Sequence, residues 1–237
     1  MNNNDQLRTL VFDVDGTLFD TLPSLAAAAN EVLVLAGLRA AEPRHLRPAL
    51  SQGVTALFKS ALLLQAAPIP LALASRLEDA FEHRYASHWL HKAVVYDGAF
   101  DLLSMLRSQG VALGICTNRD QRSTRTLLRK AGLDGFFDAI VGLGDAEHPK
   151  PDAAPLRLAL NQLDATPQTT LFVGDSGIDA ACAQAAGVRL AAHLGGYAAT
   201  PDDLHPCAVA FSRYEELLGW MAVRTSPQAS AETNRHV

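Results

Sequence analysis

The sequence predicts an α/β protein with a doubly wound parallel sheet, interrupted near its beginning by an insert made only of helices. Over residues 101–194, short segments that are apolar throughout alternate with helix-period segments, which is typical of strands covered on both faces by crossover helices. A similar apolar segment, Leu7–Val14, precedes a long stretch without any strand pattern. These observations favour one sheet with a helical domain inserted after its first strand.

The first strand and the insert can be placed in chain order. Leu7–Val14, with the letters LRTLVFDV, is rich in strand formers and ends among aspartates and a glycine. Apolar residues then keep the i, i+3, i+4, i+7 spacing of an amphipathic helix over Leu22–Ala36, and Gly37 follows. A second such stripe covers Leu73–His88. We expect residues 21–92 to form a small α-helical cap domain, and the alternative is that these helices pack on the sheet.

The rest of the chain continues the alternation of strands and helices. Further strands are expected at Val111–Thr117, Ala139–Leu143, Thr170–Gly174 and Val188–Leu194. Helices are expected at Asp101–Ser108, Gln121–Ala131, Ala153–Leu163 and Ile178–Ala186. Gly110, Gly132 and Gly187 follow three of these helices, where a left-handed residue commonly ends a helix. The expected core therefore comprises residues 1–20 and 93–224, and the polar, aperiodic residues 225–237 are expected to form a flexible tail.

The composition excludes several classes of protein. Of 237 residues, 49% are hydrophobic, which argues against a disordered chain, and the net charge of −5 offers no basic excess for a nucleic-acid backbone. The sequence shows neither a signal peptide nor an apolar segment of membrane-spanning length. Three widely spaced cysteines predict neither a disulfide framework nor a zinc site. We expect a cytoplasmic protein that binds neither nucleic acid nor membrane.

The polar residues that follow the predicted strands form the candidate site, because ligands of an open parallel sheet bind beyond the carboxyl ends of its strands. They are Asp13, Asp15, Gly16 and Thr17, then Thr117 and Asn118, then Lys150 with Pro151, and finally Gly174, Asp175, Ser176 and Asp179. The set combines carboxylates, which can hold a hard cation, with donors that can bind an anion. Each residue alone could also be an ordinary turn or helix-cap residue.

This mixture of groups suits phosphoryl transfer. A phosphate dianion repels a carboxylate nucleophile unless a cation neutralises both, and Mg²⁺, which prefers oxygen ligands, can do so. Lys150 would add a positive charge, while the Thr117 hydroxyl and backbone N–H groups near residues 16 and 17 would bind the phosphoryl oxygens. Asp13 and Asp15, two residues apart, would provide a nucleophile and an acid that protonates the leaving group.

In order and in type, these residues resemble the four motifs of the haloacid dehalogenase superfamily. The matching segments are Asp13-Val14-Asp15-Gly16-Thr17-Leu18, Thr117-Asn118, Lys150-Pro151-Asp152 and Gly174-Asp175-Ser176-x-x-Asp179. The resemblance extends over Leu7–Gly196 and implies a Rossmann-like core with a small helical cap. Within the superfamily, the segments FDVDGTLFDT, SQGVTALFKSAL, HPKPDAAPLRLAL and LFVGDSGIDAACAQAAG are similar to those of the phosphoglycolate phosphatases.

The resemblance implies a role for each residue of the motifs. Asp13 would be the nucleophile that forms an aspartyl-phosphate, and Asp15 would be the general acid and base. The metal ligands would be Asp13, Asp15 through its backbone carbonyl, Asp175 and Asp179, where Asp179 either approaches the metal through water or supports Lys150. The phosphate-binding groups would be Gly16, Thr17, Thr117, Lys150 and Asn118, the last of which orients the site. Candidates for contact with the leaving group are Arg119, which could reach a substrate carboxylate, and Gln52, Gly53 and Lys59 in the cap.

We therefore expect a Mg²⁺-dependent phosphatase that acts on a small phosphorylated metabolite, with 2-phosphoglycolate as the best candidate, and that is a monomer or a homodimer. Three departures from the usual pattern bear on the substrate and not on the chemistry: Asp97-Gly98, Arg119 after Asn118, and Gly195-Gly196-Tyr197. The alternatives are a phosphomutase, a pyrophosphate- or nucleotide-directed hydrolase, and a non-catalytic phosphate-sensing module.

Overall fold

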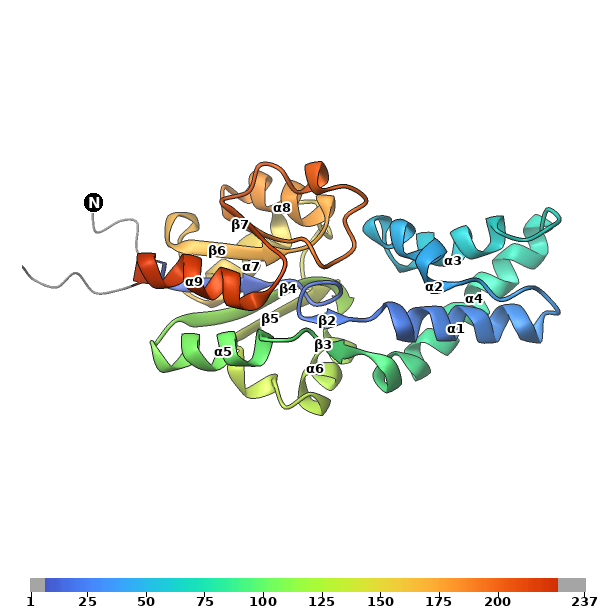
Figure 1. Ribbon diagram of the computed structural model, residues 1–237, viewed down its shortest axis with the longest axis horizontal. Coiled ribbons are helices and arrows are strands. Elements are labelled where there is room, and N and C mark those ends of the chain that lie inside the picture. The colour runs from blue at the N-terminus through green and yellow to red at the C-terminus, as the bar shows by residue number, and fades with distance from the viewer. Residues whose placement is uncertain (1–6, 226–237) are drawn as a thin grey trace, which may run out of the picture.

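The structure, a computed structural model, describes residues 7–225, without the side chains of residues 51–52, 86–92 and 223–225. Its centre is a six-stranded parallel sheet with the strand order β5-β4-β1-β6-β7-β8 (Figure 1). The strands are β1 (Thr9–Phe12), β4 (Ala112–Asp120), β5 (Ala139–Leu143), β6 (Thr170–Gly174), β7 (Arg189–His193) and β8 (Val209–Phe211). Since β1 pairs with β4 on one side and β6 on the other, the chain leaves β1 at the middle of the carboxyl edge of the sheet.

Helices cover both faces of this sheet. One face packs against α5 (Ala99–Ser108), α6 (Gln121–Lys130) and α9 (Tyr214–Thr225), and the other against α7 (Ala154–Gln162) and α8 (Gly177–Ala186). Successive residues of β1 point to opposite faces, so that Leu10 and Phe12 join the first core cluster while Val11 joins the second. Because β1 is buried on both faces, its sequence is apolar throughout instead of alternating.

The segment between β1 and the rest of the sheet forms a helical insert with its own core. The insert consists of α1 (Leu22–Leu35), α2 (Pro43–Leu46), the 3₁₀ helix η2 (Arg47–Gln52), α3 (Val54–Leu63) and α4 (Leu71–Lys92). Its buried side chains include Leu25, Leu33 and the stacked rings of Phe58 and Phe81, whose centroids lie 4.6 Å apart. In Figure 1 these helices extend to one side of the core and do not lie over a face of the sheet. The domain boundaries at residues 20/21 and 92/93 stay a prediction.

Two short strands join the insert to the core. The chain leaves the core through β2 (Phe19–Asp20) and returns through β3 (Val94–Val95), and these strands pair in antiparallel fashion. Next to them, the Tyr197 hydroxyl accepts hydrogen bonds from the backbone N–H groups of Thr21 (2.7 Å) and Leu22 (2.9 Å). The same hydroxyl donates to Oδ1 of Asp20 at 2.9 Å. One core side chain therefore holds the start of α1.

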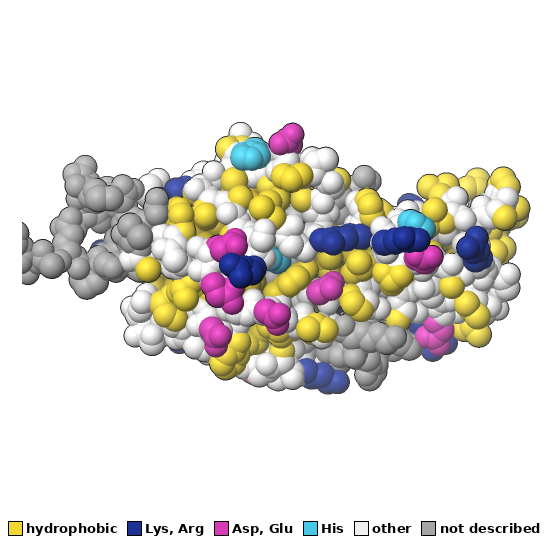
Figure 2. Space-filling model, in the orientation of Figure 1, with side chains coloured by type: hydrophobic (Ala, Val, Ile, Leu, Met, Phe, Trp, Pro, Cys, Tyr) yellow, Lys and Arg dark blue, Asp and Glu magenta, His cyan; other side chains and the backbone are white. Residues whose placement is uncertain are grey.

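The insert also touches the core further out, where Arg47 of η2 donates hydrogen bonds to the backbone carbonyls of Gly195 and Gly196. Lys and Arg side chains gather on the surface where the insert adjoins the core (Figure 2). Asp and Glu side chains also lie on this part of the surface, so charges of both signs are present near the insert.

The fold agrees with the predicted class and differs in three details. β8, at the edge of the sheet, and the short strands β2 and β3 were not expected from the sequence. β4 continues to Asp120, three residues beyond the predicted end at Thr117, with an irregular register after Cys116.

Within the described residues, no helix is both long and apolar enough to cross a membrane. Apart from Thr225, the predicted tail of residues 225–237 lies outside the described residues.

Candidate active site

The segment after β1 brings the first carboxylate of the site to the carboxyl edge of the sheet. The backbone N–H of Asp13 donates to the carbonyl of Val173 in β6 at 2.9 Å, which continues the ladder by one residue. Gly16 has a φ of +81°, and a Cβ at this position would lie 2.2 Å from Oδ2 of Asp175. Only glycine combines this left-handed backbone with so close an approach. The turn thus brings the segment after β1 against the segment after β6.

The carbonyl groups of this turn are held from the opposite half of the core. Nδ1 of His193, at the end of β7, lies 2.8 Å from the carbonyl oxygen of Gly16. The hydroxyl of Tyr214, at the start of α9, donates to the carbonyl oxygen of Thr17 at 2.8 Å. Both side chains are buried, and burial lowers the pKa of His193 below its ordinary value. A neutral imidazole and a phenol therefore hold the turn without adding charge beside the carboxylates.

Lys150 joins two of the predicted carboxylates. Its Nζ lies 2.8 Å from Oδ1 of Asp13 and 2.6 Å from Oδ1 of Asp179, and its side chain is buried. The backbone of Lys150 is held by the Asn118 amide, which donates to the carbonyl oxygen of residue 150 and accepts from its N–H, both at 2.9 Å. Asn118 thus positions the ammonium group through the main chain that carries it.

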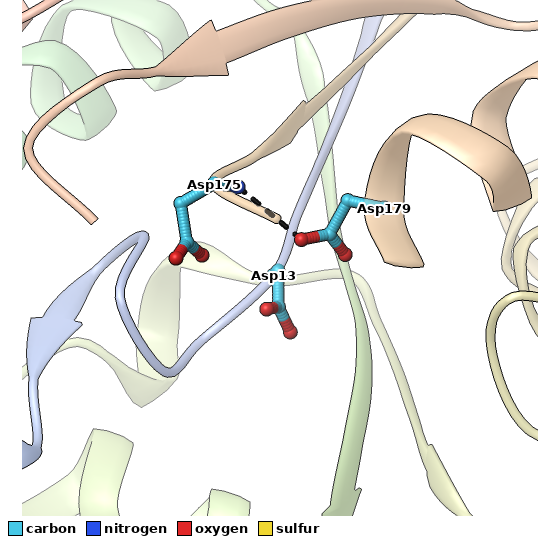
Figure 3. A group of neighbouring side chains, drawn as sticks. All are labelled: Asp13, Asp175 and Asp179. Atoms are coloured by element: carbon cyan, nitrogen blue, oxygen red, sulfur yellow. Dashed lines mark hydrogen bonds between the residues drawn. The ribbon is translucent and has the colours of Figure 1, made fainter. Parts of the chain in front are cut away.

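Asp13, Asp175 and Asp179 form a carboxylate cluster, in which one oxygen from each lies within 4.8 Å of the others. Figure 3 shows the three side chains converging from the ends of β1 and β6 and from the first turn of α8. Asp175 accepts hydrogen bonds from the Thr17 hydroxyl and from the backbone N–H of Tyr197, each at 2.7 Å. These bonds fix the Asp175 carboxylate but leave the outer lone pairs of its oxygens for a further ligand.

Asp179 combines two structural tasks. One of its oxygens accepts hydrogen bonds from the backbone N–H and the hydroxyl of Ser176, in the capping box that begins α8. That oxygen also accepts from the N–H of Asp175 at 3.2 Å, the contact drawn in Figure 3. The other oxygen pairs with Lys150. Asp179 therefore caps α8 and also pairs with Lys150, and the second contact is one of the two roles that the resemblance implied for it.

When all three are ionised, the carboxylates of the cluster carry more negative charge than Lys150 can neutralise. Burial raises the pKa of Asp13 to about 7, although Lys150 opposes the shift and Asp179 adds to it. Burial also raises the pKa of Asp175, and its neighbours Asp179 and Asp13 raise it further. Burial alone would lower the pKa of Lys150, but Asp13 and Asp179 outweigh it and raise that pKa well above its usual range. Such a site favours a divalent cation with oxygen ligands, as Mg²⁺ has.

Asp15 lies apart from the carboxylate cluster and pairs with Arg119. The guanidinium donates to both carboxylate oxygens, with 3.0 Å between Nε and Oδ2. The ring of Tyr85, from α4 of the insert, lies over the guanidinium with its centroid 5.4 Å from Cζ. Thr117 is buried, and its hydroxyl oxygen accepts a hydrogen bond from the backbone N–H of Arg119 at 3.2 Å. The Arg119 side chain, near the end of β4, therefore contacts both Asp15 of the core and Tyr85 of the insert.

The structure places the other candidates differently. The side chain of Gln52 lies outside the described residues, and Lys59 is exposed, without a contact to the carboxylate cluster among the described side chains. Gly53 has a φ of +104° at the start of α3. Cys116 is buried in the core cluster beside α7 and α8, as a small core residue. Gly53, Lys59 and Cys116 therefore add no group to the site described above.

Three residues around the site were not selected from the sequence, namely His193, Tyr197 and Tyr214. Each acts on the site from more than 20 residues away along the chain, by hydrogen bonds to Gly16, Thr17 or Asp175. Tyr197 lies in the segment Gly195-Gly196-Tyr197, and its two adjacent glycines are the one feature of the sequence that could have pointed to this residue. A Cβ on Gly196 would lie 2.2 Å from Cβ of Asp175, so the glycine permits this close approach.

A comparison with known families identifies the family of the chain. The family model described as haloacid dehalogenase-like hydrolase matches residues 10–193, which include all of β1 except Thr9, the insert and the carboxylate cluster. The chain belongs to the haloacid dehalogenase-like hydrolases. The resemblance inferred from the four motifs is therefore confirmed, and the family shares a hydrolase chemistry that this set of residues can support.

Individual relatives extend the match over most of the chain. A phosphoglycolate phosphatase of Cereibacter sphaeroides is 35% identical over 208 residues, which cover 88% of this chain and 94% of the relative. A phosphoglycolate phosphatase of Pseudomonas putida is 38% identical over 193 residues, covering 80% of this chain and 70% of the relative. A solved structure from Haemophilus somnus matches with a TM-score of 0.81 at 24% identity, covering 91% of this chain and 98% of that one. This last match confirms the predicted α/β fold class.

Proposed function

We propose that this chain is a Mg²⁺-dependent phosphatase that hydrolyses a small phosphorylated metabolite, and that 2-phosphoglycolate is the substrate to test first. The observation that carries the proposal is the Lys150 ammonium between Asp13 and Asp179, next to Asp175. Carboxylates that attract a divalent cation, beside a lysine that attracts an anion, suit a phosphate ester better than a neutral substrate. The names of the relatives from Cereibacter sphaeroides and Pseudomonas putida support the choice of substrate.

The carboxylate cluster fits Mg²⁺ by its donor atoms. Asp13, Asp175 and Asp179 offer hard oxygen ligands within 4.8 Å of one another, and burial, together with the neighbouring carboxylates, raises the pKa values of Asp13 and Asp175. These three residues would hold the ion, with the backbone carbonyl of Asp15 as a further ligand. When bound, the ion would neutralise the nucleophile and the phosphoryl oxygens so that the two can approach.

The proposed reaction has two halves. In the first, a carboxylate oxygen of Asp13 attacks phosphorus, the bond between phosphorus and the ester oxygen breaks, and the leaving group takes a proton from Asp15. In the second, water attacks the phosphorus of the aspartyl-phosphate and gives a proton to Asp15, so that inorganic phosphate leaves and the Asp13 carboxylate is regenerated. Lys150 and Thr117 would hold the phosphoryl oxygens in both halves.

The helical insert would complete the site during turnover. It begins directly after β2, and Tyr85 of α4 already reaches the Arg119 side chain. As a cap over the carboxyl edge of the sheet, the insert would exclude bulk water from the aspartyl-phosphate and contact the leaving group. Substrate choice would then depend on the residues of the insert and of the facing core loops.

The test measures inorganic phosphate released from 2-phosphoglycolate and from p-nitrophenyl phosphate, with Mg²⁺ and with EDTA. Asp13→Asn is expected to lower kcat on the order of 10³-fold or more, because it removes the nucleophile. Asp164→Asn makes the same change at an exposed carboxylate and serves as the matched control. Substantial activity of Asp13→Asn would contradict the covalent mechanism, and an absence of phosphate release from every ester would contradict the phosphatase.

Product analysis separates the remaining functions that the same residues could support. An isomerised sugar phosphate without free phosphate would indicate a phosphomutase, and preferential cleavage of a phosphoanhydride would indicate a pyrophosphate- or nucleotide-directed hydrolase. Binding of inorganic phosphate without turnover of any ester would indicate a phosphate-sensing module. Each outcome can be read from the same set of incubations with Mg²⁺.

A further inference from the structure

The Arg119 side chain occupies a position that the proposed reaction leaves unexplained. Its guanidinium donates to both carboxylate oxygens of Asp15, the residue assigned to proton transfer. The Arg119 side chain is only 2% exposed, whereas that of Asp15 is 22% exposed, so the arginine is the more deeply buried member of the pair. Tyr85 of α4 covers the guanidinium. The pair thus joins the reacting part of the core to the insert.

The pairing conflicts with the task of Asp15. Both oxygens of Asp15 face Arg119, and Asp15 is not part of the carboxylate cluster, so it has to turn at least one oxygen away from the guanidinium to pass a proton to an ester oxygen bound at that cluster. The guanidinium keeps its charge throughout, because arginine does not deprotonate in proteins. A buried charge that loses its partner is strongly unfavourable. The release of Asp15 is therefore favoured by a second anion that takes its place on Arg119.

The substrate can supply this anion only through its leaving group. The phosphoryl group belongs between Asp13 and Lys150, whose atoms lie 2.8 Å apart. In an in-line displacement the ester oxygen departs on the side of phosphorus opposite the nucleophile. Asp15 has to meet that oxygen, and the guanidinium of Arg119 is in direct contact with Asp15 and lies under the ring of Tyr85. A group that reaches Arg119 is therefore attached to the leaving oxygen, not to phosphorus.

Resting on the proposed function, we infer that Arg119 determines substrate specificity by selecting phosphate esters whose leaving group carries a second negative charge. That charge displaces Asp15 from the guanidinium, and the displaced Asp15 becomes able to protonate the ester oxygen. Since Asp15 and Arg119 are in direct contact, the second charge has to lie within a few bonds of the ester oxygen. A carboxylate matches the two parallel donors of the guanidinium best.

The test compares 2-phosphoglycolate with its neutral amide, 2-phosphoglycolamide, which has nearly the same shape. In the unmodified protein the acid should exceed the amide in kcat/KM by about 100-fold, with part of the difference in kcat, because the amide leaves Asp15 paired. In Arg119→Met this ratio should fall at least about tenfold, mainly through slower hydrolysis of the acid. Arg107→Met, which breaks an exposed arginine–carboxylate pair with Asp138, is the matched control and should keep the ratio.

Each outcome decides a different claim. An equal loss for both esters in Arg119→Met would overturn the inference, because it would mean that Arg119 binds the phosphoryl group or only maintains the fold. An unmodified protein that hydrolyses both esters equally would overturn it as well. Failure to hydrolyse either ester or p-nitrophenyl phosphate would overturn the proposed function itself, and the inference with it.

A second variant keeps the test decisive if Arg119→Met does not fold. Arg119→Lys retains the positive charge but loses the two parallel hydrogen bonds, and folding of both variants is checked by circular dichroism and thermal unfolding. We expect Arg119→Lys to give an acid-to-amide ratio between those of the unmodified protein and the methionine variant. A folded lysine variant with an unchanged ratio would show that the paired donors of Arg119 do not select the substrate.

Discussion

Replacing Asp13 by asparagine is expected to abolish turnover and, at the same time, to stabilise the metal-free protein. The substitution keeps the shape of the side chain and an oxygen that can accept a hydrogen bond from Lys150. It removes one negative charge from the carboxylate cluster, while Lys150 keeps its pair with Asp179 at 2.6 Å. If removing the charge of a functional side chain makes a protein more stable, that charge lowers the free energy of unfolding of the unmodified protein.

The size of the effect follows from the pKa of Asp13. Burial raises this pKa from 3.8 to about 7 on folding, so the folded state holds a proton that the unfolded state releases. The contribution of Asp13 to stability is therefore lost as the pH rises from about 4 to about 7. At about 1.4 kcal/mol for each pH unit, the loss is about 2 kcal/mol at pH 5 and about 4 kcal/mol at pH 8. The neutral amide of the asparagine variant avoids this loss at every pH.

The assay is urea and thermal unfolding in EDTA at pH 5 and pH 8. At pH 8 the asparagine variant should unfold at a midpoint on the order of 10 °C higher than the unmodified protein, and the gap should narrow at pH 5. Asp164→Asn, at an exposed carboxylate, should leave the midpoint unchanged. A metal-free Asp13→Asn protein that is less stable than the unmodified one at pH 8, or a gap that does not change with pH, would refute the reasoning.

Three further results are expected from the same structure. Mg²⁺ should bind more weakly at pH 6 than at pH 8, by about tenfold or more, because it has to displace protons from the carboxylate cluster; calorimetry in two buffers would measure the protons released. Tyr197→Phe leaves the N–H groups of Thr21 and Leu22 without their phenol acceptor and should lower the free energy of unfolding by about 1–3 kcal/mol in urea titrations. Gly16→Ala places a methyl group 2.2 Å from Oδ2 of Asp175, so thermal unfolding should no longer respond to Mg²⁺; a normal response would contradict the close approach.

Local patterns were sufficient to predict the sheet and the helices that cover it. The strands at Ala139–Leu143 and Thr170–Gly174 were predicted with the bounds that the structure shows, because each is a continuous apolar segment between turn residues. β8 has only three residues, and one of them is exposed, so it lacks such a pattern. β2 and β3 are strands because they pair with each other at the two ends of the insert. Neither of these two-residue segments has a local sequence pattern that predicts a strand.

The candidate site divides in the same way. The position of a polar residue after a strand can be recognised from the local sequence. For this reason Asp13, Lys150 and Asp175 could be assigned to one predicted site. The pair of Asp15 with Arg119 joins residues 104 positions apart, and it depends on the course of the chain after the register of β4 becomes irregular. From the sequence alone, only a contact with the substrate could be predicted for Arg119, because its ion pair with Asp15 depends on the tertiary structure.

The contacts of Tyr197 have a consequence for the exchange of parts between relatives. Its backbone N–H holds the Asp175 carboxylate, and its hydroxyl holds the first two N–H groups at the entry to the insert. Replacing the insert by that of a relative, in order to change substrate choice, would alter the segment that the Tyr197 hydroxyl contacts. A shift of Tyr197 would in turn move the Asp175 carboxylate. The transferable unit is therefore the insert together with residues 195–197, although some 100 residues of chain separate the two segments.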